Sequence, residues 1–315
     1  MEADKLIKLI KNEWVKLWAK KATWVMLIMS ILSIFILLGG MKWISSLDNT
    51  NDWKKNQQIT INEMQKELDS GQLDAKEAKM YKDDLTLAHY KLEHDIDDTN
   101  MNTGGSFLSN SKFLVMFISL FSVIVAAGIV SFEFSTGTIK MLLTRPIARW
   151  KILLSKLLTT FIFSITLGLL TYVISLLSSL VFFSEKGQIL TVVGNKVIEK
   201  SPAFDVLKEY GLAYGEITMS VLFAFMLGTL FRSSSLAIGL TLFITFASGT
   251  FIALLSQYTF VKYLWFSVTD LSGILADTSF IPGLTIGFAL TIMAIYAVIF
   301  IIVSFLIFNK RDVTA

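Results

Sequence analysis

The sequence contains no cysteine, and only three prolines and two histidines occur among its 315 residues. The absence of cysteine excludes a disulfide framework, a thiol nucleophile and a thiolate metal site. His89 and His94 lie five residues apart and would point to different sides of a helix, so they do not form a metal-ligand pair. The phosphate-binding pattern Gly-x-x-x-x-Gly-Lys-Ser/Thr is absent, and no segment resembles the nucleophile elbow of a hydrolase. We therefore expect no catalytic residues and no cofactor or metal bound by this chain, which is expected not to be an enzyme.

Charged residues are also scarce, at 17%, whereas hydrophobic residues make up 54% and the mean hydropathy is +0.63. The net charge of +3, with basic residues at the ends of apolar blocks, does not suggest a nucleic-acid partner. The apolar residues form blocks of about 20 or more, the length with which a helix crosses the hydrocarbon core of a bilayer. The sequence thus predicts an all-α membrane protein with six transmembrane helices. Their expected ranges are 22–44, 113–131, 157–183, 210–231, 235–256 and 283–308.

The distribution of lysine and arginine predicts the orientation of these helices. Thirteen such residues fall in the two terminal segments and in the connections on the same side, whereas the two shorter connections on the other side hold five. Because lysine and arginine accumulate in short cytoplasmic loops, both termini are expected in the cytoplasm.

The first 21 residues have the pattern of an amphipathic helix. Apolar and aromatic residues recur on one face, and lysines occupy the other, a pattern typical of a helix that lies in the membrane interface. The apolar face holds Leu6, Ile10, Trp14, Leu17 and Trp18, and the polar face holds Lys5, Lys8, Lys11, Asn12 and Lys16. The alternative is an ordinary flanking segment of the first transmembrane helix.

Residues 45–111 form the only long polar region, with seven lysines and thirteen acidic residues. Two apolar stripes at helical spacing lie on either side of Ser70–Gly71, and Asp74 with Glu77 resembles a capping box for the second helix. The first stripe is Ile61, Met64 and Leu68, and the second is Tyr81, Leu85, Ala88 and Leu92. We expect an extracellular helical hairpin.

The remaining residues, 112–315, are expected to hold five further transmembrane helices. The external connection at 258–282 is rich in apolar and aromatic residues, including Trp265 and Phe266. Such a segment is unsuited to a solvated loop, because its side chains need an apolar environment and its backbone needs internal hydrogen bonds. It is expected to form a re-entrant or interfacial helical segment packed against the outer ends of the transmembrane helices.

The connection at 132–151 carries the most informative pattern. It places a glutamate at the end of a transmembrane helix, followed by Gly-Thr, an amphipathic turn, Arg-Pro and a basic run. This pattern resembles the signature of bacterial type-2 ABC exporter permeases, and the layout of almost the whole chain is similar to that family. The residues that match are Glu133, Gly137, Thr138, Leu142, Pro146, Arg149 and Lys156, with Arg145 preceding the proline. The alternative is a generic cytoplasmic loop whose cations only fix the orientation.

The resemblance implies a permease subunit of an ATP-driven exporter in the bacterial plasma membrane. In that family the segment at 132–151 is the coupling element that docks on a cytoplasmic ABC ATPase. The implied ATPase-coupling residues are Glu133, Gly137, Thr138, Leu142, Arg145, Pro146 and Arg149. The implied partners are two copies of the ATPase subunit, which binds the ATP, a second permease chain, identical or related, and the membrane lipids.

The spans themselves carry few charges, which favours an apolar or amphipathic substrate, either lipid-like or a peptide antibiotic. Glu216 is the acidic residue most embedded in apolar sequence and is a candidate pathway residue; the alternative is that it marks the membrane interface. Two other functions are open: a non-transporting sensor or scaffold that acts through the acidic hairpin, and a secondary transporter. The latter usually has charged or broken helices at mid-membrane and inverted repeats, which this sequence lacks.

Overall fold

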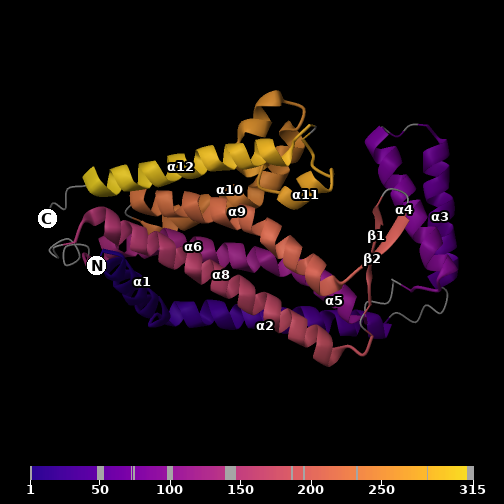
Figure 1. The fold of residues 1–315 in the computed structure, drawn as a ribbon, viewed down its shortest axis with the longest axis horizontal. Coiled ribbons are helices and arrows are strands. Elements are labelled where there is room, and N and C mark those ends of the chain that lie inside the picture. Colours follow the sequence, from indigo (N-terminus) through magenta and orange to yellow (C-terminus); the bar gives the residue numbers. More distant parts are fainter. Residues whose placement is uncertain are drawn as a thin grey trace. The chain divides into compact units, whose positions relative to one another are not determined.

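The computed structural model describes residues 2–47, 53–71, 73, 75–97, 102–138, 147–185, 187–193, 196–231, 233–281 and 283–310. The described chain is mostly helical (Figure 1). Six helical segments are long and apolar enough to cross a membrane, as the sequence predicts. They are Lys21–Ser46, Gly104–Ser135, Arg149–Phe182, Pro202–Leu230, Ser234–Leu255 and Ile286–Lys310.

The helices extend beyond the apolar blocks that predict them. Helix α8, Arg149–Phe182, begins eight residues before the predicted start at 157, and α9, Pro202–Leu230, begins eight residues before 210. The helices continue through the polar residues at these ends, which the length of an apolar block does not reveal. The second apolar segment also starts early: α5, Gly104–Asn110, begins at the N-cap Thr103, within the range predicted for the hairpin.

The chain forms two compact units. The first comprises residues 1–31, 114–171 and 209–315, and the second comprises 32–113 and 172–208. Helices α2 (Lys21–Leu47), α8 and α9 contribute residues to both.

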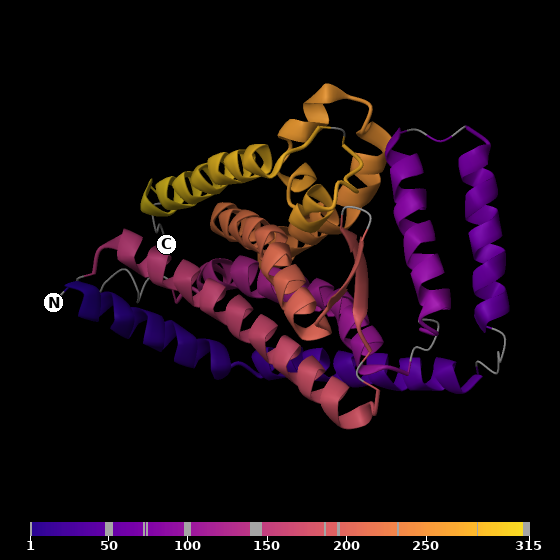
Figure 2. The ribbon, with the colours of Figure 1, turned by 45° about the vertical axis from the view of Figure 1, so that its right-hand side comes forward.

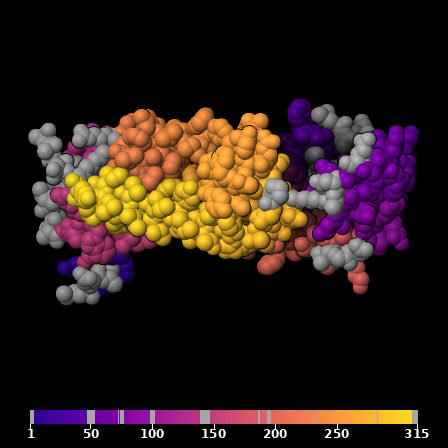
Figure 3. All heavy atoms as spheres, turned by 90° about the horizontal axis from the view of Figure 1, so that it is seen from above, coloured from indigo at the N-terminus to yellow at the C-terminus, as the bar shows by residue number. Residues whose placement is uncertain are grey.

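Helix α6, Val115–Ser135, provides much of the core of the first unit. Within the described structure, 61% of the apolar window in Gly104–Ser135 is buried, compared with 6% for α10, Ser234–Leu255. Helix α12, Ile286–Lys310, exposes one side, where Leu290, Ile295, Val298 and Ile302 are about half accessible. Figure 3 shows α12 in yellow beside the orange atoms of the preceding segments. Such apolar surface is suited to contact with lipid or with another membrane helix.

The apolar segment before α12 folds into three short helices: η2 (Thr259–Tyr263), η3 (Trp265–Ser267) and α11 (Leu271–Leu275). Trp265 is buried, and its ring lies 5.2 Å from that of Phe223 in α9 and 6.1 Å from that of Phe300 in α12, measured between centroids. Trp265 therefore packs this segment against α9 and α12.

The second unit contains the predicted helical hairpin. Helices α3, Trp53–Asp69, and α4, Ala75–Glu93, lie side by side (Figure 2). Ile61, Leu85 and Ala88 are buried between them, and Met64, Leu68 and Leu92 pack around this core. The first predicted stripe and three of the four members of the second, all except Tyr81, thus form one core. Asp74, half of the predicted capping box, lies outside the described residues.

A two-stranded antiparallel sheet also belongs to the second unit and corrects the all-α prediction. Strand β1, Ile189–Val193, pairs with β2, Lys196–Lys200, in the register Ile189 to Lys200 and Val193 to Lys196, and the sheet lies against α4. The sequence signal was present, because β-branched residues lie on both sides of Gly194–Asn195. Such an arrangement is typical of a β-hairpin.

Candidate functional site

The described part of the connection after α6 is anchored by Glu133. The Thr138 hydroxyl donates a hydrogen bond to Glu133 Oε2 at 3.1 Å, and the Thr136 hydroxyl donates to the carbonyl oxygen of Phe132 at 2.8 Å. Gly137 adopts a φ of 71°, in the left-handed region that glycine reaches without steric cost. The predicted residues Glu133, Gly137 and Thr138 therefore form one turn at the end of α6. Leu142, Arg145 and Pro146 lie outside the described residues.

Lys156 of α8 is buried and binds two carboxylates. Its Nζ lies 2.7 Å from Glu13 Oε2 and 2.8 Å from Glu133 Oε1. The side chains of Lys156, Glu13 and Glu133 are only 1%, 7% and 11% exposed. Burial of an unpaired charge carries a large desolvation free energy. The ion pairs offset this desolvation for all three groups.

Lys16 completes this group, which we call the ionic cluster: Glu13, Lys16, Glu133 and Lys156. The Nζ of Lys16 lies 3.2 Å from Glu13 Oε1 and 3.5 Å from Glu133 Oε1, and its side chain is 43% exposed. Two cations thus balance two carboxylates. The shorter bonds belong to Lys156, so Lys16 is the more loosely held cation.

The cluster joins three helices that are far apart in sequence. Glu13 and Lys16 come from α1, Glu2–Trp18, whereas Glu133 lies near the end of α6 and Lys156 lies in the second turn of α8. Sequence reasoning identified Glu133 and Lys156 but missed Glu13. A signal existed, because Glu13 follows Ile10 by three residues and precedes Leu17 by four, which places a carboxylate on the apolar face of the helix.

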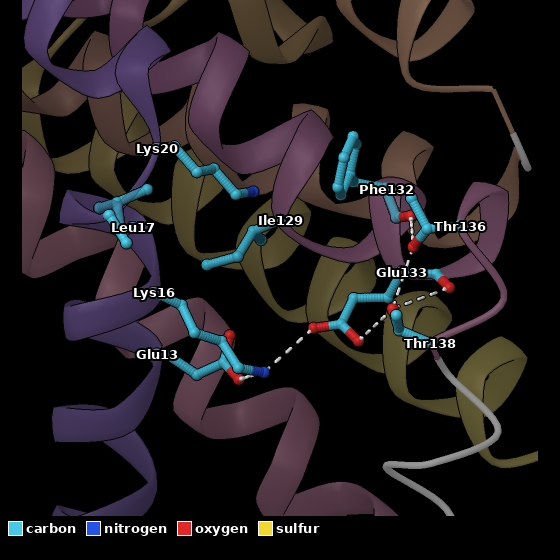
Figure 4. Close-up of a pocket in the computed structure, with 10 residues that line it drawn as sticks. Glu13, Lys16, Leu17, Lys20, Ile129, Phe132, Glu133, Thr136 and Thr138 are labelled. Atoms are coloured by element: carbon cyan, nitrogen blue, oxygen red, sulfur yellow. Dashed lines mark hydrogen bonds and ion pairs between the residues drawn. The ribbon is translucent and has the colours of Figure 1, made fainter.

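A pocket of about 460 Å³ lies beside the cluster, between the end of α1 and the end of α6 (Figure 4). Leu17, Ala19, Ile129 and Phe132 supply apolar lining, and the cluster members Glu13, Lys16 and Glu133 are joined by Lys20, Thr136 and Thr138. The Lys20 ammonium lies 4.7 Å from the centre of the Phe132 ring. Desolvation, followed by the charge of Lys156, lowers the pKa of Lys20 from its ordinary value.

Two other predicted residues lie apart from the ionic cluster. The Arg149 guanidinium, at the start of α8, donates a hydrogen bond to the carbonyl oxygen of Asn309 near the end of α12 at 3.2 Å. Glu216 is partly buried in α9, where the Leu271 side chain of α11 lies against the adjacent Gly215. Arg149 therefore belongs to the base of the connection, whereas Glu216 has a separate environment. Within the described residues, no group of three or more His, Asp or Glu side chains has the arrangement of a metal site.

Comparison with known proteins identifies a family and two relatives that this chain matches. The family described as "Protein of unknown function (DUF2705)" matches residues 78–314. The "Uncharacterized protein YhcI" of Bacillus subtilis (strain 168) is 33% identical over 314 residues, covering 98% of this chain and 99% of the relative. The "Uncharacterized membrane protein YdbK" of the same organism is 32% identical over 212 residues, covering 66% of this chain and 82% of the relative. The name of YdbK agrees with the six apolar helices in indicating a membrane location. Because the family match spans most of the chain and YhcI aligns over nearly all of it, the chain belongs to the DUF2705 family.

Proposed function

We propose that the chain is a permease subunit of an ATP-driven exporter of the type-2 ABC class. A separate ABC ATPase, present in two copies, binds and hydrolyses the ATP and docks on residues 132–151. Two permease chains, identical or related, form the pathway in the bacterial plasma membrane. The α1 helix lies in the cytoplasmic interface, both termini are cytoplasmic, the α3–α4 hairpin is extracellular, and the segment at 258–282 re-enters the membrane from outside.

The observation that carries this proposal is the ionic cluster at the base of the connection. Force applied by an ATPase to residues 132–151 reaches Glu133 and Arg149 at the two ends of that segment. Glu133 is held by Lys156 at 2.8 Å, and Lys156 holds Glu13 at 2.7 Å. Because breaking a buried ion pair costs about 3–5 kcal/mol, the ends of α1, α6 and α8 move together. A docking segment attached to such a rigid group suits mechanical coupling rather than chemistry.

The substrate class is inferred from the scarcity of charged side chains in the membrane-spanning helices. Threonine and serine are the main polar side chains buried in α8, including Thr159, Thr160, Ser164 and Thr171. A pathway for ions would be expected to carry several intramembrane acids. Apolar side chains interrupted by hydroxyls instead favour an apolar or amphipathic substrate, lipid-like or a peptide antibiotic.

The proposal is tested by affinity purification of the tagged full-length chain from its native cells in mild detergent. We expect a Walker-motif ATPase to copurify in near-equal amount. Leu142→Asp and Arg149→Ala should reduce its recovery at least about five-fold, a difference of roughly 1 kcal/mol in binding, because both change residues of the coupling segment. Lys8→Ala on the exposed side of α1 should leave it unchanged. Equal elution profiles of the four chains on size exclusion control for folding. Absence of any ATPase from every gentle preparation of the parent chain contradicts the exporter assignment.

A second function, a membrane sensor or scaffold, is favoured by the independent core of the α3–α4 hairpin, which Ile61, Leu85 and Ala88 form. Deletion of residues 53–97, which removes α3 and α4 and leaves α5 intact, separates the two functions. A permease is expected to keep its copurifying ATPase and part of the substrate-independent ATP turnover after this deletion. A sensor or scaffold is expected to copurify with no ATPase, whether or not the hairpin is present. Recovery of the ATPase and its ATP turnover, compared with those of the full-length chain, are the measurements.

A further inference from the structure

We propose that the pocket between α1 and α6 binds the headgroup of an anionic phospholipid, with Lys20 and Lys16 as the cations that hold its phosphate. This inference is independent of the transport function, because it rests on the pocket, its charges and the neighbouring tryptophans.

The charge balance of the pocket favours an anion. Among its lining residues, Glu13 and Glu133 contribute two negative charges and Lys16 and Lys20 two positive ones. The buried Lys156, which does not line the pocket, adds a third positive charge behind the two carboxylates. Lys156 satisfies both carboxylates through its short bonds, which leaves Lys16 weakly held at 3.2 and 3.5 Å. Among the described residues, Lys20 has no carboxylate within 4 Å and instead lies over the Phe132 ring. The ammonium of Lys20 thus remains available to a ligand, and that of Lys16 can turn toward the same ligand.

The lining also suits the boundary between a headgroup and its acyl chains. The hydroxyls of Thr136 and Thr138 lie 3.0 Å apart and make one end of the pocket polar. Both already donate, to the carbonyl oxygen of Phe132 and to Glu133 Oε2, so the donors to the phosphate oxygens are the ammonium groups of Lys16 and Lys20. Ile129 and Phe132 line it on the apolar side, and Phe132 is 50% exposed. Figure 4 shows Lys20 on the α1 side of the pocket and Phe132, with the turn that follows it, on the α6 side. A free phosphate ion would gain nothing from such apolar lining, whereas the acyl chains of a phospholipid would pack against it.

The junction between α1 and α2 provides the third argument, because it carries the residues of a membrane interface. The Trp14 and Trp18 rings lie 5.6 Å apart and the Trp18 and Trp24 rings 5.4 Å apart, and the Trp24 indole donates to the carbonyl oxygen of Trp18. Tryptophan concentrates at the level of lipid headgroups, and basic pockets between membrane helices bind anionic headgroups. Lys20 is only two residues from Trp18, so the pocket is expected at headgroup depth.

The test is equilibrium lipid binding by the purified, delipidated full-length chain, measured by native mass spectrometry. The probes are phosphatidylglycerol, phosphatidylcholine and inorganic phosphate. We expect one saturable phosphatidylglycerol site that binds phosphatidylcholine at least about five-fold more weakly. Lys20→Gln should weaken phosphatidylglycerol binding about five-fold, the effect of one lysine near a charged lipid. Ala19→Phe, which fills the pocket without changing its charge, should abolish the site.

Lys8→Gln is the matched control, because Lys8 is an exposed lysine of α1 outside the pocket. Lys20 and Ala19 are also exposed, so none of these substitutions removes a buried contact. Equal losses with Lys8→Gln and Lys20→Gln would indicate diffuse surface attraction and overturn the proposal. It is equally overturned if phosphatidylcholine binds as well as phosphatidylglycerol, or if inorganic phosphate at the same concentration displaces the lipid, which would make this a site for free phosphate.

Discussion

Lys156→Met is expected to lower the free energy of unfolding by about 3–5 kcal/mol, the usual result of removing one partner from a buried ion pair. Methionine has a similar length and fills the space, but it leaves Glu13 and Glu133 buried with only the more exposed Lys16 to compensate them. The carboxylates of Glu13 and Glu133, which both contact Lys156 Nζ in the parent chain, would then repel each other. The measurement is thermal unfolding of the purified chain in detergent, where a loss of this size lowers the midpoint by several degrees.

Lys151→Met provides the control for Lys156→Met. It removes the same charge from the same helix, but Lys151 is less buried and its ammonium lies over the Trp150 ring. Adding Glu133→Gln to Lys156→Met should recover part of the loss, because it removes one of the uncompensated carboxylates. A midpoint for Lys156→Met equal to that of Lys151→Met would show that the cluster does not stabilise the fold.

Gly228→Val is expected to destabilise the first unit by more than the roughly 1–3 kcal/mol typical of overpacking. A Cβ at Gly228 in α9 would lie 2.5 Å from the carbonyl oxygen of Ala127 and 3.1 Å from its Cα in α6. Both contacts are with backbone, so no rotation of a side chain relieves them and the two helices have to separate. The midpoint of thermal unfolding and the yield of folded protein are the measurements.

Gly128→Val is the matched control, because Gly128 follows Ala127 directly but a Cβ there would meet no atom within 4 Å from outside its own stretch of helix. It should be tolerated, since valine is a better helix former than glycine. If the two variants unfold at the same temperature, the close approach of α6 and α9 does not limit stability.

The glycines illustrate what the sequence leaves open. Gly39–Gly40, Gly128, Gly228 and Gly239 all lie in long apolar helices. A Cβ added at Gly228 would meet the backbone of Ala127, whereas one added at any of the others would meet no atom within 4 Å from outside its own stretch of helix. Small residues are common in membrane helices, so their presence does not show which one faces another backbone. Only the packed arrangement of the helices distinguishes them.

The candidate site was predictable in part. Glu133, Gly137 and Thr138 form one turn, and Lys156 binds Glu133, so residues noted from their pattern lie together. Glu13 was missed because its partner Lys156 is 143 positions away, and no local pattern pairs them. The β1–β2 hairpin was missed for a different reason: its β-branched residues lie in a short polar connection between long apolar helices.

The sequence by itself determined the six apolar helices, the amphipathic α1 and the two stripes of the α3–α4 hairpin. These features depend on the length of each apolar block and on the spacing of apolar residues within it. The hydrophobic effect favours burial of such blocks and stripes independently of distant parts of the sequence. Only the tertiary structure decided that Lys156 neutralises both Glu13 and Glu133, that Lys20 borders a pocket, and that α6 meets α9 at Gly228. Those facts depend on which helix faces bury against each other, because a charge pair or a backbone contact forms between residues that packing, and not sequence proximity, brings within a few ångströms.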